Sequence, residues 1–337
     1  MTRVNTADDA RRQAAGFQAL YGKIKAQIGR LIVGQDEVVD GVITALLAGG
    51  HVLLEGVPGL GKTMLVRALS QAIDAKFSRI QFTPDMMPAD IQGTAVLTET
   101  EKGLELRFQE GPLVSNLVLA DEINRATPKT QSALLEAMQE RQITVGRRTI
   151  ALEEPFCVLA TQNPVEQEGT YPLPEAQLDR FLFKLVVGYP REEDYAAILD
   201  RTTGDVETNI EAVASARDIV DLRHVVRAVP VPAHAKQYAI HLVMATQPGS
   251  PYAPKMINDY VSLGSSPRGA QSLLLAAKVR SLVNGRYSVS TSDIRDIALP
   301  VLRHRLLVNF QAQSDRITDE KIVQEVLSSV RPPNTIG

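Results

Sequence analysis

A glycine-rich segment in the first quarter of the chain has the residue types and spacing that bind phosphate groups. It reads Gly-Val-Pro-Gly-Leu-Gly-Lys-Thr from Gly56 to Thr63, which fits the pattern G-x-x-x-x-G-K-[ST]. Glycines let successive backbone N–H groups turn toward phosphate oxygens, Lys62 adds a positive charge for the β- and γ-phosphates, and the Thr63 hydroxyl is suited to Mg²⁺. An apolar run precedes the segment and a helical pattern follows it, as this motif requires. The sequence therefore predicts a nucleotide site formed by Gly56, Val57, Pro58, Gly59, Leu60, Gly61, Lys62, Thr63 and Met64.

Two adjacent acidic residues follow another apolar run and are suited to hydrolysis. Asp121 and Glu122 come directly after Leu117–Ala120. Because parallel sheets bind ligands at the carboxyl ends of their strands, we expect Asp121 to hold Mg²⁺ and Glu122 to orient and deprotonate a water molecule. Alone, such a pair is more often a solvated strand end, but its place after Lys62 in one alternating pattern favours catalysis. A carboxylate base favours water as the acceptor, so hydrolysis is preferred to phosphoryl transfer onto a metabolite.

Three further polar residues are candidates for completing this site. Asn163 follows the apolar run Phe156–Ala160, where its amide could bind the γ-phosphate or hold the attacking water. Arg180 ends a short helical pattern, and Arg268 begins a longer one from which it is expected to point back toward the nucleotide. A guanidinium that reaches a γ-phosphate stabilises the charge of the transition state. Each candidate has an ordinary alternative, which is a turn for Asn163 and a surface position for the arginines.

Five short apolar runs alternate with amphipathic stretches between residues 31 and 190. Helical patterns at 62–73 and 128–140 lie among them. Strands separated by helices are typical of βαβ units, which form parallel sheets covered by helices on both faces. We therefore predict an α/β domain over residues 31–190. Its expected strands are His51–Leu54, Phe77–Phe82, Leu117–Ala120, Phe156–Ala160 and Leu182–Val187.

Two segments break this alternation and predict β-hairpin insertions. Thr94–Phe108 has apolar residues on both sides of Lys102-Gly103, and Gln142–Leu152 has a glycine at its centre. Plain surface loops and functional elements are both open interpretations of these hairpins.

Helical patterns flank the α/β region on both sides. Residues 1–30 predict a helical lead-in, and residues 191–337 predict an all-α lid domain. Helices are expected in the lid at 192–201, 218–228, 233–246, 267–283 and 291–308, with no strands between them.

Composition narrows the classes of protein to consider. The 337 residues are 44% hydrophobic and carry 36 Lys+Arg against 39 Asp+Glu, a net charge of −3, which disfavours both disorder and nucleic-acid binding. No run approaches a membrane span, and the N-terminal residues lack the apolar core of a secretory signal, so we expect a cytoplasmic protein. The single cysteine, Cys157, excludes an internal disulfide and is expected to be a buried, inert side chain. The five histidines are scattered, so no protein-bound transition metal is proposed.

Taken together, these motifs resemble those of AAA+ ATPases with a P-loop core and a lid, and more narrowly those of the MoxR family. The resemblance covers roughly residues 30–310, and Thr127 stands where the family commonly has proline. It is carried by Val33–Gln35, Glu55–Thr63, Gln81–Asp85, Pro88–Ile91, Asp121–Ala126, Pro128–Gln131, Ala133–Met138, Ala160–Pro164 and Pro174–Phe181.

The resemblance implies a cytoplasmic ring, a hexamer in this family, that binds ATP and Mg²⁺ at the boundaries between its subunits. Val33 and Gly34 are then assigned to the nucleotide site, Arg180 acts on the neighbouring subunit's γ-phosphate, and Arg125 contributes across the same boundary. Both hairpins face the central pore. Such proteins are chaperone-like ATPases that mature or activate a client complex, often together with a von Willebrand factor A domain protein.

Three alternatives to a remodelling ATPase stay open. A motor subunit of a metal-chelatase complex would share the hairpin insertions, a nucleic-acid translocase is disfavoured by the balanced charge, and a scaffold that binds nucleotide without hydrolysis is disfavoured by Glu122. The sequence does not identify the client protein.

Overall fold

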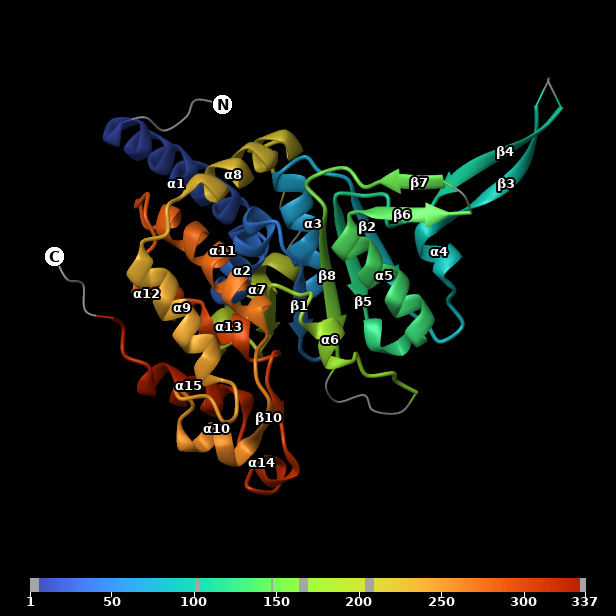
Figure 1. The fold of residues 1–337 in the computed structure, drawn as a ribbon. Helices are drawn as coiled ribbons and strands as arrows, with labels where there is room; N and C mark the ends of the chain where they lie inside the picture. Colours follow the sequence, from blue (N-terminus) through green and yellow to red (C-terminus); the bar gives the residue numbers. More distant parts are fainter. Residues whose placement is uncertain (1–5, 101–102, 147, 164–168, 204–208, 334–337) are drawn as a thin grey trace.

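The computed structural model describes residues 6–100, 103–146, 148–163, 169–203 and 209–333, and a five-stranded parallel sheet lies at its centre (Figure 1). The strand order is β2-β5-β8-β1-β9, and each neighbouring pair is parallel. Each strand coincides with one of the predicted apolar runs to within two residues, which confirms the α/β class. The strands are β1 (Val52–Glu55), β2 (Phe77–Gln81), β5 (Leu117–Asp121), β8 (Cys157–Gln162) and β9 (Phe183–Val186).

Alternate residues of the central strands enter two separate hydrophobic clusters. In β1, Leu53 belongs to one cluster, whereas Val52 and Leu54 belong to the other. Helix α5 (Pro128–Glu140) packs in the cluster of Leu53. Helices α1 (Ala7–Gly29), α2 (Asp36–Ala48) and α3 (Lys62–Ala72) pack in the other cluster. Helices therefore cover both faces of the sheet, as a parallel sheet requires.

Both predicted hairpins are present. Strands β3 (Gly93–Thr100) and β4 (Gly103–Glu110) form a long antiparallel pair that projects from the body of the molecule (Figure 1). The shorter pair is β6 (Gln142–Val145) and β7 (Arg148–Ala151). The first hairpin follows a short helix directly, and no helix lies between β4 and β5. Gly93, with φ of 100°, ends the short helix α4 (Pro88–Gln92) in a conformation that other residues rarely adopt.

The region after residue 191 is mostly helical, and two of its predicted features are wrong. The pattern at 291–308 is not one helix, because it breaks at Ile297 and continues into the short strand β11 (Leu307–Val308). This strand pairs with β10 (Val261–Leu263), so the lid also contains strands. The helices are α7 (Glu192–Thr203), α8 (Ala216–Ala228), α9 (Ala233–Ala245), α10 (Lys255–Tyr260), α11 (Pro267–Val283), α12 (Thr291–Asp296), α13 (Ala298–Leu302), α14 (Phe310–Ser314) and α15 (Asp319–Ser329).

The sheet region and the helical lid share one hydrophobic cluster. Helix α11 of the lid packs against α1 and α2, and buried residues of all three belong to that cluster. The predicted division of the chain at residues 31 and 191 therefore stays a prediction. None of the helices in the described ranges has both the length and the apolar character needed to cross a bilayer.

Candidate functional site

A cavity of about 360 Å³ opens where β1, β5 and β8 end. It brings together the predicted residues Lys62, Thr63, Asp121, Glu122 and Asn163, which come from three separate segments. Of the predicted loop residues, Gly56, Val57 and Leu60 do not line it, and neither do Val33 and Gly34, whose assignment stays a prediction. The lining residues are Pro58, Gly59, Gly61, Lys62, Thr63, Met64, Arg79, Gln81, Asp121, Glu122, Thr161 and Asn163.

The loop between β1 and α3 has a backbone conformation suited to an anion. Gly59 and Gly61 have φ of 85° and 78°, a region that residues with a side chain rarely adopt. No side chain caps the first turn of α3, so its backbone N–H groups and its helix dipole are available to a phosphate. A Cβ on Gly56 would lie 2.6 Å from the carbonyl oxygen of Val187. Glycine is therefore needed in this loop for the left-handed turn at Gly59 and Gly61 and for the close packing of Gly56 against Val187, which follows β9.

The Lys62 side chain lies between the loop and the acidic pair. Its Nζ donates to the Gly56 carbonyl oxygen at 2.5 Å. Partial burial lowers the pKa of Lys62, and the carboxylates of Asp121, Glu122 and Glu55 act in the opposite direction. The ammonium group is therefore placed where it can exchange a backbone carbonyl for phosphate oxygens.

Asp121 ends β5 with both carboxylate oxygens hydrogen-bonded. Thr161 Oγ1 donates to Oδ1 at 2.6 Å, and Arg79 Nη2 donates to Oδ2 at 2.6 Å from the neighbouring strand β2. The guanidinium shows that this carboxylate attracts a cation. Together with the Thr63 hydroxyl on the same cavity, Asp121 provides the hard oxygen ligands that Mg²⁺ prefers, so the residues present fit this metal.

Glu122 has a left-handed backbone conformation, with φ of 56°. Its N–H donates to Thr161 Oγ1 at 2.8 Å, and its Oε2 accepts from Gln81 Nε2 at 2.8 Å and from Arg125 Nη1 at 3.1 Å. One hydroxyl, that of Thr161, thus links the two acidic residues. Strained residues persist where their neighbours enforce the conformation, and they cluster at functional sites.

The turn that follows Glu122 is held by a buried amide. Gln131 of α5 donates from Nε2 to the carbonyl oxygens of Ile123, Ala126 and Tyr171 at 3.2, 3.1 and 2.9 Å. These bonds fix the short helix η1 (Ile123–Arg125) and therefore the side chain of Arg125 beside Glu122.

Sequence reasoning missed three residues of this cavity. Arg79 and Gln81 lie on β2, and Thr161 lies on β8. A signal for the first two was present, because residues two apart on a strand share a face, and these are polar residues inside an apolar run. Their partner strand was not foreseeable from the sequence, because β2 and β5 are joined through α4 and a hairpin.

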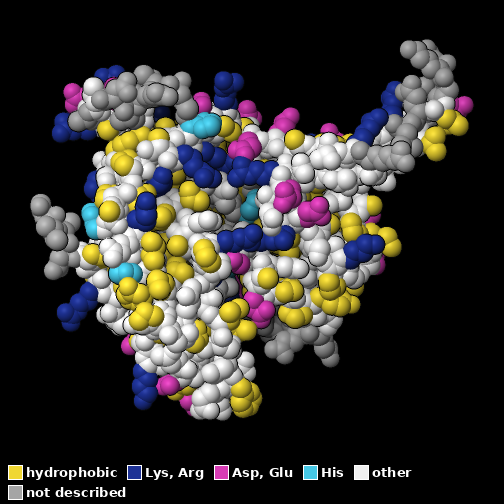
Figure 2. All heavy atoms as spheres, viewed as in Figure 1, with side chains coloured by type: hydrophobic (Ala, Val, Ile, Leu, Met, Phe, Trp, Pro, Cys, Tyr) yellow, Lys and Arg dark blue, Asp and Glu magenta, His cyan; other side chains and the backbone are white. Residues whose placement is uncertain are grey.

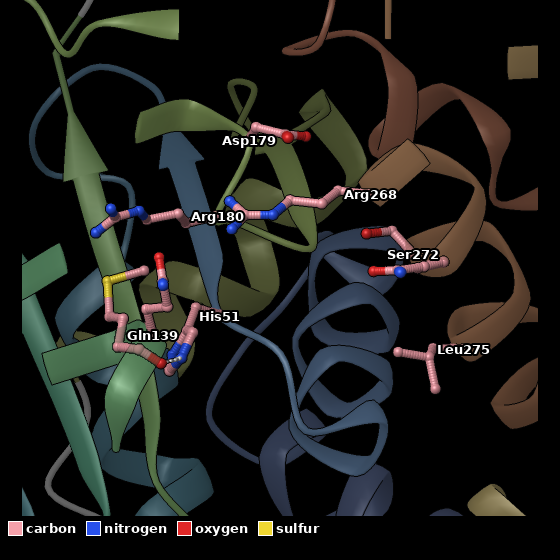
Figure 3. A pocket seen from close by; sticks show the side chains of 9 residues that line it. His51, Gln139, Asp179, Arg180, Arg268, Ser272 and Leu275 are labelled. Carbon is pink, nitrogen blue, oxygen red and sulfur yellow. Dashed lines mark hydrogen bonds between the residues drawn. The ribbon is translucent and has the colours of Figure 1, made fainter. Parts of the chain in front are cut away.

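The two predicted arginines lie together in a second cavity, of about 250 Å³ (Figure 3). It is lined by Arg180, which follows α6 (Glu175–Leu178), by Arg268 at the start of α11, and by His51 and Gln139. The structure does not bring Arg268 to the phosphate loop of its own chain, since neither arginine lines the cavity around Lys62. Lys and Arg side chains gather across this part of the surface (Figure 2).

Two known protein families match this chain, one over the sheet region and one over the helical lid. The family described as "ATPase family associated with various cellular activities (AAA)" matches residues 51–183, and the family described as "AAA lid domain" matches residues 254–326. The first match contains the phosphate loop, the acidic pair and Arg180. The second contains Arg268.

Relatives match the chain over nearly its whole length. The "Chaperone MoxR1" of Mycobacterium tuberculosis is 42% identical over 91% of this chain and 81% of its own length. The "Protein MoxR" of Methylorubrum extorquens is 30% identical over 98% and 100%. A Bacillus subtilis protein named YeaC is 46% identical over 93% and 95%. A solved structure from Cytophaga hutchinsonii, assigned as an ATPase, has 38% identity and a TM-score of 0.90 over 97% of this chain and 99% of its own.

Proposed function

This chain belongs to the MoxR family of AAA+ ATPases, and from this premise we propose that it hydrolyses ATP, with Mg²⁺, at the boundary between two subunits of a ring. One subunit provides the phosphate loop, on which Lys62 binds the β- and γ-phosphates. Glu122 takes the proton of the attacking water. Mg²⁺, held by Thr63 and Asp121, would neutralise charge that develops on the phosphate oxygens.

The separation of the two cavities is the observation that carries this proposal. The phosphate loop lines one cavity, whereas Arg180 and Arg268 line another, so we infer that a second copy of the chain brings these two arginines to the phosphate. Among the described residues, the buried Nε of Arg180 has no hydrogen-bond partner. A contact of this kind, repeated around a closed ring, gives every subunit the same composite site, and six subunits are proposed from the family. Asn163 completes the site on the phosphate-loop side. Arg125, which donates to Glu122 of its own chain, is proposed from the family to contribute across the same boundary.

The work driven by hydrolysis is proposed to be the remodelling of a partner protein complex in the cytoplasm. The β3–β4 hairpin projects from the body of the molecule (Figures 1 and 2). It carries Leu97 and Leu104, which are 66% and 72% exposed. Exposed apolar side chains on a projecting hairpin are suited to contact a client chain, and a position facing the ring's pore would bring six hairpins together. The relative named as a chaperone supports this role. A von Willebrand factor A domain protein is the proposed adaptor.

Mixed assemblies test the shared site. Arg180→Ala should abolish hydrolysis of ATP while ATP binding is retained, because the phosphate loop of that chain is intact. Mixing it with Lys62→Ala should restore part of the phosphate release, since the second variant supplies Arg180 to the intact loop. Co-assembled rings that show no restoration would contradict an arginine supplied by the neighbour.

A nucleotide-locked variant tests the proposed partners. Glu122→Gln keeps the size of the side chain and the contact to Gln81 while removing the base, so ATP should bind with Mg²⁺ and should not turn over. Affinity isolation of this variant with ATP is expected to retain a von Willebrand factor A domain protein and its client. Recovery of a large chelating subunit in their place would favour the chelatase motor instead. Turnover by Glu122→Gln at the normal rate would exclude Glu122 as the base.

A further inference from the structure

A buried arginine, Arg305, joins the helical lid to the segment that carries Arg180. Its side chain is 1% exposed. The guanidinium donates to the carbonyl oxygens of Phe181 at 2.6 Å and Leu182 at 3.2 Å, to Ser272 Oγ of α11 at 3.1 Å, and to a carbonyl oxygen of α13. One side chain therefore connects the α6–β9 segment, α11 and α13.

Asp179 is the acidic partner of this arginine and reaches the same helix α11 by a second route. Arg305 Nε donates to Asp179 Oδ1 at 2.8 Å, and Ser266 Oγ donates to Asp179 Oδ2 at 2.7 Å. Ser266 is the N-cap of α11, and its Oγ accepts from the backbone N–H of Arg268 at 3.1 Å. Because Asp179 directly precedes Arg180 in the chain and Ser266 bonds both to Asp179 and to the backbone of Arg268, this carboxylate is tied to the backbone of both cavity arginines.

We propose that Arg305 and Asp179 are positioning residues, which hold Arg180 and Arg268 at a fixed separation so that both arginines engage one phosphate group on the neighbouring subunit. This inference rests on the proposed function of Arg180. Two guanidiniums can share one phosphate only when their backbones keep a set distance, and small displacements weaken such contacts strongly. The lid and the Arg180 segment then move as one body, and the change at hydrolysis occurs at the subunit boundary.

The chemistry of the pair suits this role better than apolar packing would. Burial lowers the pKa of Arg305 to about 10, and the Asp179 carboxylate acts in the opposite direction, so the guanidinium is charged at neutral pH. Its hydrogen bonds have fixed directions, whereas apolar contacts would allow α11 to slide along the Arg180 segment.

The variants Asp179→Asn and Ser266→Ala, made in the full-length chain, test the inference. Each should lower kcat for ATP, by about tenfold or more for Asp179→Asn and by severalfold for Ser266→Ala, because the arginines lose their alignment. The Kd for a fluorescent ATP analogue with Mg²⁺ should stay within about twofold of the unmodified protein, since Lys62 and its loop are intact. Mixing either variant with Lys62→Ala should restore part of the activity, because the neighbour then supplies correctly held arginines.

The lid contains a matched control for each variant. Asp293 is fully buried, pairs with Arg286 and accepts from the N-cap residue Ser290 at 2.7 Å, but it lies away from both cavities. Asp293→Asn and Ser290→Ala should lower the melting temperature. Neither should show a loss of kcat that is restored by mixing with Lys62→Ala. A kcat unchanged in assembled Asp179→Asn, or a loss that mixing with Lys62→Ala does not rescue, would overturn the inference. Full hydrolysis by Arg180→Ala would instead overturn the proposed function on which it rests.

Discussion

Arg79 on β2 and Asp121 on β5 form an ion pair inside the cavity around Lys62, with 2.6 Å between Nη2 and Oδ2. The pair uses the same carboxylate that the proposed mechanism assigns to Mg²⁺. Magnesium and the guanidinium therefore compete for one negative charge. The side chain of Arg79 is 48% exposed, so the pair contributes only about 1 kcal/mol, which corresponds to about a fivefold change in an equilibrium.

Replacement of Arg79 should ease magnesium binding. Arg79→Met is expected to lower the Mg²⁺ concentration for half-maximal ATP binding by about fivefold, measured by titration at fixed nucleotide. Arg67→Met, at an exposed position on α3, is the control and should leave the titration unchanged. A higher magnesium requirement in Arg79→Met would show that Arg79 assists the metal rather than competes with it.

Replacement of Thr161 tests how Asp121 and Glu122 are held in place. Its hydroxyl donates to Asp121 and accepts from the backbone N–H of Glu122, so Thr161→Val removes both bonds at nearly constant volume. Glu122 then loses the contact that supports its left-handed backbone, and kcat should fall by at least about tenfold with little change in ATP affinity. Thr161→Ser keeps the hydroxyl and should retain most of the activity. Equal losses in both variants would assign the effect to packing instead.

The phosphate loop was predictable from the sequence because its chemistry is local. Gly59 and Gly61 adopt backbone conformations that their own residue type permits, and Lys62 follows them in the chain. The acidic pair was predictable for a related reason, since an apolar run ending in carboxylates specifies both the strand and its functional end.

Other features depend on which elements meet, and local patterns do not carry that information. The placement of Arg268 follows from the docking of α11 beside the Arg180 segment through Arg305, which lies 126 residues after Asp179 in the chain. The strand β11 depends on pairing with β10, which lies more than forty residues earlier. The break at Ile297 has a local cause, because Pro300 has no backbone N–H and is tolerated only in the first turn of a helix. The buried state of Cys157 was foreseen, and burial also raises the pKa of its thiol to about 12, which makes it unreactive.

The β3–β4 hairpin should separate basal hydrolysis from client remodelling. Leu97 pairs with Leu106 across the hairpin, so Leu104, two residues before Leu106, lies on the same face as Leu97. Because Leu97 and Leu104 are exposed, replacing both with serine should change stability by less than about 0.5 kcal/mol and leave basal phosphate release intact. Stimulation by the partner recovered with Glu122→Gln should be lost. Gln109→Ser, at an exposed position on β4, is the control, and retained stimulation in the double variant would exclude this face as the contact.

His51 makes the stability of the fold depend on pH. Its ring is buried, with Nδ1 accepting from the Val158 N–H at 2.9 Å and Nε2 lying 3.1 Å from the Met138 carbonyl oxygen. Burial lowers the pKa of His51 to about 4. Between about pH 6.5 and 4 the unfolded chain therefore binds a proton at this residue that the folded chain does not, and stability falls as the pH falls through this window.

Comparing the unmodified protein with His51→Gln isolates the effect of His51 on stability from the effects of other titrating groups. One of these is His304, which is also buried, and burial lowers its pKa as well. His51→Gln keeps one donor and one acceptor but cannot titrate. It should be less stable at pH 7, because the amide fits the two partners less well. Between pH 7 and pH 5, however, it should lose about 2 kcal/mol less of its free energy of unfolding than the unmodified protein, as measured by urea titration at both pH values. Parallel losses in the two proteins would mean that His51 does not titrate in this window, and its burial would then have no part in the acid sensitivity of the fold.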